Sequence, residues 1–267
     1  MKILSIDVGI KNLAYCILDV PNNTSNYSIV AWDVINLCGT PPVCNQKIKK
    51  GNCTRLAKFQ KNNIRCCKSC AKKTEFIIPT EELSKVTQTR TKVGDLKIIA
   101  QNYGLKPTSF KKTDIQEVIA CFMKKNCLDV IPKYSASEMS LIDIGVAIRN
   151  NLNDSSFLSV DKVLIENQIS PIANRMKTIQ GMIAQFFIMQ NIEDVQFVSA
   201  ANKLKPYIKD KKTTYKERKA LGISTTREII NENADLNAWI EHFSKHSKQD
   251  DLADSFLQGL WYINNGV

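Results

Sequence analysis

The N-terminal segment is the part of the sequence that most constrains the fold. Two largely apolar runs, residues 2–8 and 12–19, lie on either side of the short sequence Gly-Ile-Lys-Asn, which predicts two strands joined by a tight turn. A third strand is expected over residues 27–37, so that the three could form a meander in which Asp7 lies on the central, buried strand. Asp7 interrupts this first strand, and a buried carboxylate needs a partner or a metal ion.

The second half of the chain returns to strand and helix patterns after a long insertion. The expected elements are a helix over residues 137–151, a strand over 161–165 that ends at Glu166, a long helix over 171–190 with Pro171 in its first turn, a short strand over 195–199, and a last helix over 248–263. The Lys-rich stretch 203–219 is expected to be partly mobile. The order of elements predicts an α/β fold with helices packed on a mixed central sheet.

Three further acidic residues belong with Asp7. Glu166 ends the apolar run KVLIENQ, and Asp251 and Asp254 lie in KQDDLADSFLQGLWYI. The two aspartates are three residues apart in a helical pattern, so they share one face. Like charges on one face repel unless a cation lies between them, and hard oxygen ligands from separate segments suit Mg²⁺ or Mn²⁺. The four acids therefore predict metal-assisted cleavage of phosphodiester bonds.

Each of these acids also has an ordinary structural explanation. Asp7 could be a turn residue beside Gly9, and Glu166 could be a surface acid at the end of a strand. Asp251 and Asp254 could be first-turn acids that the helix dipole favours. The combination of all four is what favours a metal site over these separate explanations.

The composition favours a nucleic-acid partner. The chain has 267 residues, of which 43% are hydrophobic, and a formal net charge of +11. The length allows one large domain or two small ones, and the positive excess favours a polyanion. No run of 18 apolar residues is present, so no membrane span is expected. The start of the chain has neither a secretory nor a mitochondrial targeting pattern, so a reducing compartment is expected.

A Cys-rich insertion is expected over residues 38–75. No Asp or Glu occurs between Val34 and Thr74, Lys and Arg recur throughout, and six of the nine cysteines fall in this stretch. In a reducing compartment, cysteines are expected to be thiols or metal ligands rather than disulfides. The composition therefore indicates a separate module.

Four of these cysteines form a candidate zinc site. Cys67 and Cys70 have the C-x-x-C spacing that lets two thiolates bind one Zn²⁺ ion, and Cys44 and Cys53 would complete a tetrahedral four-thiolate site. Two alternative ligands stay open: Cys66 could take the place of Cys67, and Cys38 could take the place of Cys44. A group of free thiols in a loop is the alternative. Zinc would explain how so polar a stretch folds, because metal binding supplies folding free energy.

A helical insertion is expected over residues 90–130. Two segments with helical apolar spacing are joined by GLKPTSFKKT, and the whole stretch resembles a SAP motif, a helix–extended–helix element that binds DNA. The resemblance implies a small core of Leu96, Ile99, Leu105, Ile115, Val118 and Ile119, with Lys106, Lys111 and Lys112 at phosphate groups. A plain helical hairpin that covers the sheet is the alternative.

Four motifs together resemble a known family of nucleases. SIDVGIKNLA, LIENQ, TTYKERK and KQDDLADSF are similar to the signatures of RuvC-type Holliday junction resolvases, in the branch found in poxviruses and other large DNA viruses, which is similar to the mitochondrial cruciform-cutting endonucleases. The resemblance implies an RNase H-like core over residues 1–37 and 137–267. It also implies a homodimer that nicks four-way DNA junctions symmetrically, as a crossover junction endonuclease in viral recombination and repair.

The resemblance also implies the residues of the active site. Its four catalytic acids correspond to Asp7, Glu166, Asp251 and Asp254, which would hold two Mg²⁺ ions, with Mn²⁺ as a substitute. Asp250 is the fallback for Asp251. The family places a basic residue near the acids, for which Lys219 is the first candidate, followed by Lys216 and Lys248.

Other functions stay open at this point. A broader nuclease that cuts flaps or forks would use the same acids, and a non-catalytic DNA-binding scaffold would use only the inserted modules. An actin-like kinase or ATPase is disfavoured because a second phosphate-binding DxG segment is missing. An intracellular viral enzyme would act in the host cytoplasm, within the viral factory, or in the nucleus.

Overall fold

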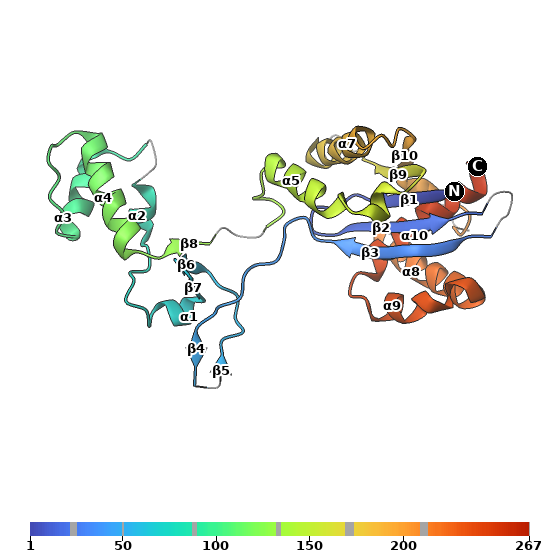
Figure 1. Ribbon diagram of the computed structural model, residues 1–267, viewed down its shortest axis with the longest axis horizontal. Coiled ribbons are helices and arrows are strands. Elements are labelled where there is room, and N and C mark those ends of the chain that lie inside the picture. Colours follow the sequence, from blue (N-terminus) through green and yellow to red (C-terminus); the bar gives the residue numbers. More distant parts are fainter. Residues whose placement is uncertain are drawn as a thin grey trace. The chain divides into compact units, whose positions relative to one another are not determined.

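The chain forms two compact units in the computed structural model (Figure 1). The structure describes residues 1–21, 26–49, 51–86, 90–131, 135–168, 174–208 and 213–266. The first unit consists of Met1–Gly39 together with Ser135–Val267, and the second consists of Thr40–Tyr134.

A five-stranded sheet forms the centre of the first unit. Its strands are β1 (Lys2–Asp7), β2 (Leu13–Asp19), β3 (Ser28–Ile35), β9 (Lys162–Asn167) and β10 (Val195–Ser199). They lie in the order β10-β9-β1-β2-β3, so that β1 is the central strand. The first three strands are antiparallel, whereas β9 and β10 run parallel to β1. This arrangement confirms the predicted mixed central sheet.

The turn between β1 and β2 depends on a close backbone contact at Gly9. A Cβ atom at this position would lie 2.2 Å from the carbonyl oxygen of Asn12, so a side chain cannot be added without moving the turn. The turn is also joined to the end of β3, because Leu37 N donates to the carbonyl oxygen of Ile10 at 2.9 Å. The end of β1 that carries Asp7 is thereby fixed.

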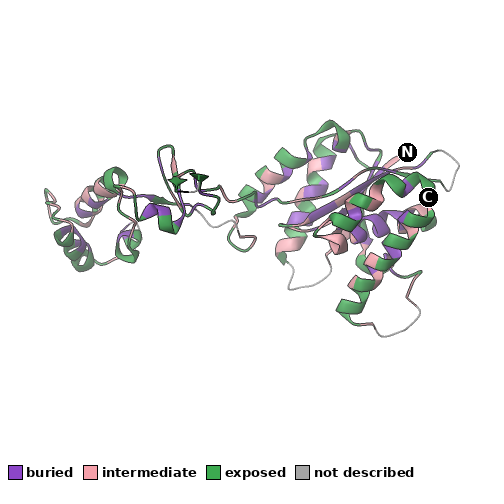
Figure 2. Ribbon diagram, turned by 90° about the horizontal axis from the view of Figure 1, so that it is seen from below, coloured by how far each residue is buried: buried purple, intermediate pink, exposed green. Residues whose placement is uncertain are grey.

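One face of the sheet is covered by α5 (Leu141–Leu152), the short α6 (Ser155–Leu158) and α7 (Asn174–Met189). Alternate residues of β1, including Leu4 and Ile6, face this layer and are fully buried in its core. Pro171, expected in the first turn of the long helix, lies outside the described residues. Figure 2 shows buried residues gathered in the sheet and on the helix sides that face it.

The other face is covered by C-terminal helices. These are α8 (Tyr215–Glu232), α9 (Ile240–Lys245) and α10 (Gln249–Asn265), with the 3-10 turns η2 (Ala200–Asn202) and η3 (Ala234–Trp239). The centre of this core is Trp32 on β3, whose ring stacks on Phe243 and whose Nε1 donates to the carbonyl oxygen of Leu252 at 3.0 Å. Among the described residues, no helix is long and apolar enough to cross a membrane.

The second unit contains two small sheets and several helices. The strands are β4 (Lys47–Ile48), β5 (Gly51–Asn52), β6 (Phe59–Lys61), β7 (Ile64–Cys66) and β8 (Asp129–Val130). The helices are α1 (Lys68–Ala71), α2 (Glu81–Lys85), α3 (Val93–Asn102) and α4 (Lys112–Asn126). Strands β4 and β5 form a hairpin, and β6 lies between β7 and β8.

The helices of the second unit have their own small core. Leu96 and Ile99 of α3 are buried against Ile115 and Ile119 of α4, as the sequence predicts. Val118, also expected in this core, is only half-buried because it lies to the side of the contact between the helices. Lys106 and Lys111 are exposed between them, where phosphate could reach them.

Candidate active site

Two of the acids lie side by side at one edge of the central sheet. Asp7 ends β1, and Glu166 lies near the end of β9, the parallel neighbour of β1. The register pairs Ile6 with Ile165, so the next residues along, Asp7 and Glu166, reach the same level. Because side chains alternate along a strand, both acids project to the face that α10 covers.

The other two acids begin α10, which is held close to the sheet. Gln258 donates from Nε2 to Ser5 Oγ at 3.1 Å and to the carbonyl oxygen of Ile6 at 3.2 Å. At the neighbouring Gly259, a Cβ atom would lie 2.6 Å from Cδ1 of Leu18. This close contact brings the first turn of α10, with Asp251 and Asp254, to the edge where β1 ends.

A buried lysine lies at the point where the acids meet. Lys203 Nζ is 3.3 Å from Asp7 Oδ1, 3.0 Å from Glu166 Oε1 and 3.5 Å from Asp254 Oδ2. Its side chain is only 5% exposed. The structure thus brings three of the four predicted acids around a single ammonium group.

Lys203 is the residue that the sequence analysis missed. It lies in the Lys-rich stretch 203–219, but its side chain is enclosed by the acids and by the core. The available signal is its position one short turn after β10, a strand parallel to β1 and β9. The carboxyl ends of parallel strands meet at one edge of a sheet, so a residue there is placed near Asp7 and Glu166.

Crowding of the carboxyl groups changes their acidity. Burial and the charge of Asp7 raise the pKa of Glu166 to about 8, although Lys203 opposes this shift. Burial raises the pKa of Asp254 to about 6, with Lys203 lowering it and Asp7 raising it. Burial works to lower the pKa of Lys203, but the charges of Asp7, Asp254 and Glu166 outweigh it and raise the pKa.

Asp251 has the features of a metal ligand. Its Oδ2 atom is buried without a hydrogen-bond partner among the described residues. Burial and the charges of Asp250 and Asp7 raise the pKa of Asp251. A divalent cation would supply the missing positive charge, and carboxylate oxygens are the ligands that Mg²⁺ prefers. The donor set therefore fits a metal site.

The neighbouring acid has a different partner. Asp250 forms an ion pair with Lys219 of α8, and Lys219 also lies over the ring of Tyr215. Lys216 is exposed on the same helix, and Lys248 precedes α10, where its charge partly offsets the rise in the pKa of Asp251. The geometry thus separates Asp250 from the acids around Lys203.

A pocket of about 400 Å³ opens beside the acids. Its lining combines Glu166, Asp254 and Lys203 with Arg218, Lys219 and Tyr215. A lining that contains both acids and cations suits a phosphate group that is bound next to metal ligands.

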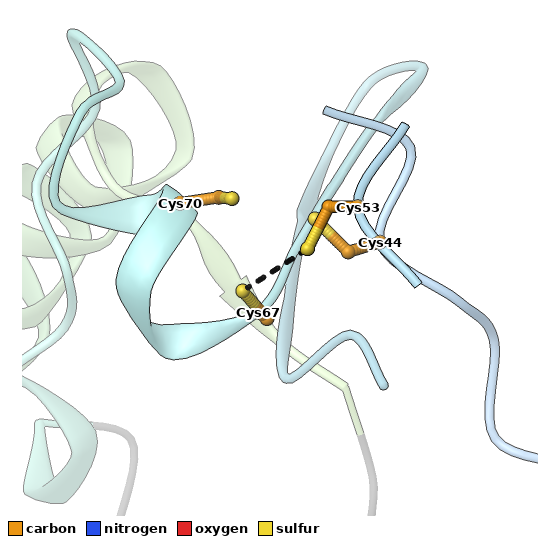
Figure 3. A group of neighbouring side chains, drawn as sticks. All are labelled: Cys44, Cys53, Cys67 and Cys70. Carbon is orange, nitrogen blue, oxygen red and sulfur yellow. Dashed lines mark hydrogen bonds between the residues drawn. The ribbon is translucent and has the colours of Figure 1, made fainter. Parts of the chain in front are cut away.

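The predicted zinc ligands also come together, in the second unit. The sulfur atoms of Cys44, Cys53, Cys67 and Cys70 all lie within 4.8 Å of one another (Figure 3). All four side chains are buried. Cys66 lies outside this group, and Cys38 is in the core of the first unit. Neither of these two alternative ligands is therefore part of the cluster. The cluster could bind zinc.

Two protein-family models match this chain. A family model described as "Poxvirus A22 protein" matches residues 125–265, which is more than half of the chain. The chain belongs to this family. A second model, described as "Mitochondrial resolvase Ydc2 / RNA splicing MRS1", matches residues 3–130 of this A22-family chain. Together the two matches confirm the family resemblance that the four motifs predict.

Individual relatives are distant. An uncharacterized protein of Acanthamoeba polyphaga mimivirus is 26% identical, with the match covering 98% of this chain and 74% of that protein. The fowlpox virus Holliday junction resolvase has 16% identity and a TM-score of 0.43, with full coverage of both chains. The yeast mitochondrial resolvase Ydc2 has 14% identity and a TM-score of 0.40, covering 98% of this chain and 78% of that one.

Proposed function

We propose that this A22-family chain is a metal-dependent endonuclease that resolves four-way DNA junctions. The observation that carries the proposal is the meeting of Asp7, Glu166 and Asp254 around Lys203, beside a pocket with further cations. Membership of the family supports it, as does the match to a model described as a mitochondrial resolvase.

The four acids would hold the metal. Asp7, Glu166, Asp251 and Asp254 would bind two Mg²⁺ ions, with Mn²⁺ as a substitute. When bound, such ions orient a water molecule and stabilise the charge that develops on the phosphate. Gln168 keeps one oxygen of Glu166 in place, because its Nε2 donates to Oε2 at 2.9 Å, which leaves Oε1 toward Lys203.

The basic residues would bind and orient the DNA backbone. Lys203 lies close enough to the acids to contact a phosphate oxygen of the reacting group and to offset its charge. Arg218 and Lys219 line the same pocket and would hold the adjoining phosphates. Asp250 keeps Lys219 on the pocket wall through their ion pair, so that Lys219 would contact an adjoining phosphate and not the reacting one.

The substrate and assembly follow from the same proposal. A net charge of +11 suits a branched DNA molecule with many phosphates. Symmetric nicking of two strands needs two active sites, which a homodimer provides. The enzyme would act during recombination of viral DNA inside the host cell, in the cytoplasm or the nucleus.

The test is cleavage of a mobile four-way junction beside matched duplex and flap DNA, with and without Mg²⁺. Paired, ligatable nicks on opposite strands are expected from the wild type, whereas Asp254→Asn and Asp7→Asn should bind the junction without cutting it. Asp143→Asn is the matched control, because Asp143 lies in the first turn of α5 on the other face of the sheet.

Three results would contradict the proposal. Cutting of flaps without paired nicks would indicate a broader structure-selective nuclease, because the cleavage chemistry is shared. Tight junction binding with no product under either Mg²⁺ or Mn²⁺ would indicate a DNA-binding scaffold. If the Asp7→Asn variant cut the junction as well as the wild type does, the assignment of the four acids as metal ligands would be wrong.

A further inference from the structure

The cysteine cluster of the second unit is built from two separate pieces of backbone. Cys44 and Cys53 flank the β4–β5 hairpin, where Cys53 N donates to the carbonyl oxygen of Gln46 at 2.9 Å. Cys67 and Cys70 lie at the start of α1 and within it. Figure 3 shows the side chains from the hairpin and from α1 pointing toward a common centre.

The spacing of the sulfur atoms suits one tetrahedral ion. A Zn²⁺ ion with four thiolates at its usual bond length separates the sulfur atoms by about 3.8 Å. The sulfur atoms of Cys53 and Cys67 are 3.9 Å apart, and all four lie within 4.8 Å of one another. All nine cysteines are free, so the cluster is four converging thiols and not two disulfides.

The surroundings of the cluster suit a negatively charged metal complex. Zinc with four thiolates carries a net charge of about −2. Lys49, Arg55 and Lys73 line a pocket together with Cys53 and Cys70. Arg55 is oriented by Ser69, whose Oγ accepts from its Nη1 at 2.9 Å. The cations would offset the charge of the bound ion.

We propose that Cys44, Cys53, Cys67 and Cys70 hold one structural Zn²⁺ ion, and that this ion fixes the fold of the whole second unit, including the helical pair α3–α4. The proposal concerns a metal centre separate from the acids of the first unit. It does not depend on which DNA the protein cuts.

The need for a metal follows from the small core around the cysteines. Apart from the cysteines, the fully buried apolar residues of this core are Ala71 and Leu128, with partly buried aromatic and aliphatic side chains around them. The hairpin β4–β5 has two residues in each strand, which is too short to be stable alone. Metal binding would supply the folding free energy that this core lacks.

The link to the helical pair runs through the central strand of the second sheet. Phe59 of β6 pairs with Cys66 of β7 on one side and with Val130 of β8 on the other. Strand β8 directly follows α4, and the residue before β8, Leu128, is buried in the same core as the cysteines. Order at the cysteines is thus connected to the C-terminal end of α4.

Two further contacts hold α4 to this sheet. Lys61 of β6 donates from Nζ to the carbonyl oxygen of Lys124 at 2.6 Å, near the end of α4, although the Lys61 side chain is otherwise buried. Ile77 N donates to the carbonyl oxygen of Asn126 at 2.9 Å, and Leu128 N donates to the carbonyl oxygen of Ile77 at 2.9 Å. Loss of the metal should therefore loosen α4 as well as the hairpin.

The first experiment measures the metal content of the full-length protein. Plasma mass spectrometry should find one zinc per chain, and Co²⁺ exchanged into the protein should give the visible spectrum of a tetrahedral thiolate site. Cys44→Ser and Cys70→Ser should lose the zinc and the spectrum. Cys66→Ala is the matched control, because this buried thiol lies outside the group, and it should keep both.

The second experiment follows amide hydrogen exchange of the full-length protein after zinc is removed with a chelator. Exchange should rise in β6, β8 and α4, and should stay unchanged in β1 and β9 of the first unit. Re-addition of Zn²⁺ should restore protection. A variant that failed to fold would also lose protection in β1 and β9, which separates misfolding from loss of the metal.

Three results would overturn the proposal. One is wild-type protein without zinc after purification from zinc-containing medium. Another is unchanged zinc in Cys44→Ser or Cys70→Ser. The third is increased exchange that stops at the cysteine segments and leaves α4 protected.

Discussion

The ammonium group of Lys203 lies 3.0 Å from Oε1 of Glu166, and the two side chains are only 5% and 14% exposed. Such a pair is costly to bury unless both charges are compensated. Asp7 and Asp254 share the same ammonium group, so the carboxylates outnumber the cation. The arrangement is one that a divalent ion would complete, and it makes Lys203 the residue whose replacement is most informative.

Replacement of Lys203 by Met should destabilise the metal-free protein and impair cutting. Removal of one partner from a buried ion pair costs about 3 kcal/mol, and loss of one charge-stabilising group lowers the rate by about 10²-fold. Denaturant unfolding in EDTA and single-turnover junction cleavage would measure the two effects. Lys205→Met is the matched control, because Lys205 is exposed. Equal effects of the two substitutions would contradict this role for Lys203.

The raised pKa values of the buried carboxyl groups predict how stability depends on pH without metal. Burial raises the pKa of Glu166 to about 8 and that of Asp254 to about 6. At pH values above the ordinary pKa values of these carboxyl groups, the folded protein therefore binds more protons than the unfolded chain. The free energy of unfolding should therefore fall as the pH rises from about 5 to about 8. The raised pKa of Lys203 adds stability that is lost only at much higher pH, outside this window.

Thermal unfolding in EDTA between about pH 5 and about pH 8 checks this dependence. The slope should be smaller in Glu166→Gln than in the wild type, because the substituted amide does not titrate. Mg²⁺ should reverse the trend, since metal binding requires ionised carboxylates and stabilises the folded state more at high pH. A wild-type slope that Glu166→Gln leaves unchanged would rule out Glu166 as its source.

The sequence predicted the sheet and the acids for identifiable reasons. Residues 2–8 and 12–19 alternate around a turn that requires glycine, and the segment before Glu166 is a continuous apolar run, as expected for a buried parallel strand. The spacing of Asp251 and Asp254 placed both on one helix face. These features are local, and local patterns are what a sequence displays directly.

Two features of the site depend on contacts between distant segments. Lys203 looked like one lysine among many, because its burial results from β10, η2 and α10 meeting at the sheet edge. The ion pair between Asp250 and Lys219 depends on how α8 packs against α10. Spacing alone therefore could not separate Asp250 from Asp251, or Lys203 from Lys219.

The two adjacent acids of α10 should behave differently when replaced. Asp251→Asn should weaken Mg²⁺ binding and abolish cutting, because Asp251 has a buried oxygen without a partner and is affected by the charge of Asp7. Asp250→Asn should keep metal binding, since it removes only a partly exposed ion pair with Lys219 worth about 1 kcal/mol. Calorimetric titration of Mg²⁺ and junction cleavage would measure both. The opposite ranking would make Asp250 the ligand.

The close packing of α10 on the sheet predicts opposite effects for two glycine substitutions. At Gly259, a Cβ atom would lie 2.6 Å from Cδ1 of Leu18 and 3.2 Å from Cβ of Ser5, so Gly259→Ala should push α10 from β1 and destabilise the protein by about 1–3 kcal/mol. It should also reduce cutting, because Asp251 and Asp254 move with the helix.

Gly222 of α8 is the matched control for this effect. A Cβ atom there would meet Ala253 and Leu257 only at 4.0 Å, which is ordinary contact. Because alanine favours a helix interior over glycine, Gly222→Ala should stabilise the protein by up to about 1 kcal/mol and leave cutting unchanged. Denaturant unfolding and junction cleavage of the two variants test the idea. If Gly259→Ala were as stable and active as Gly222→Ala, the distance between α10 and β1 would not control the position of the acids.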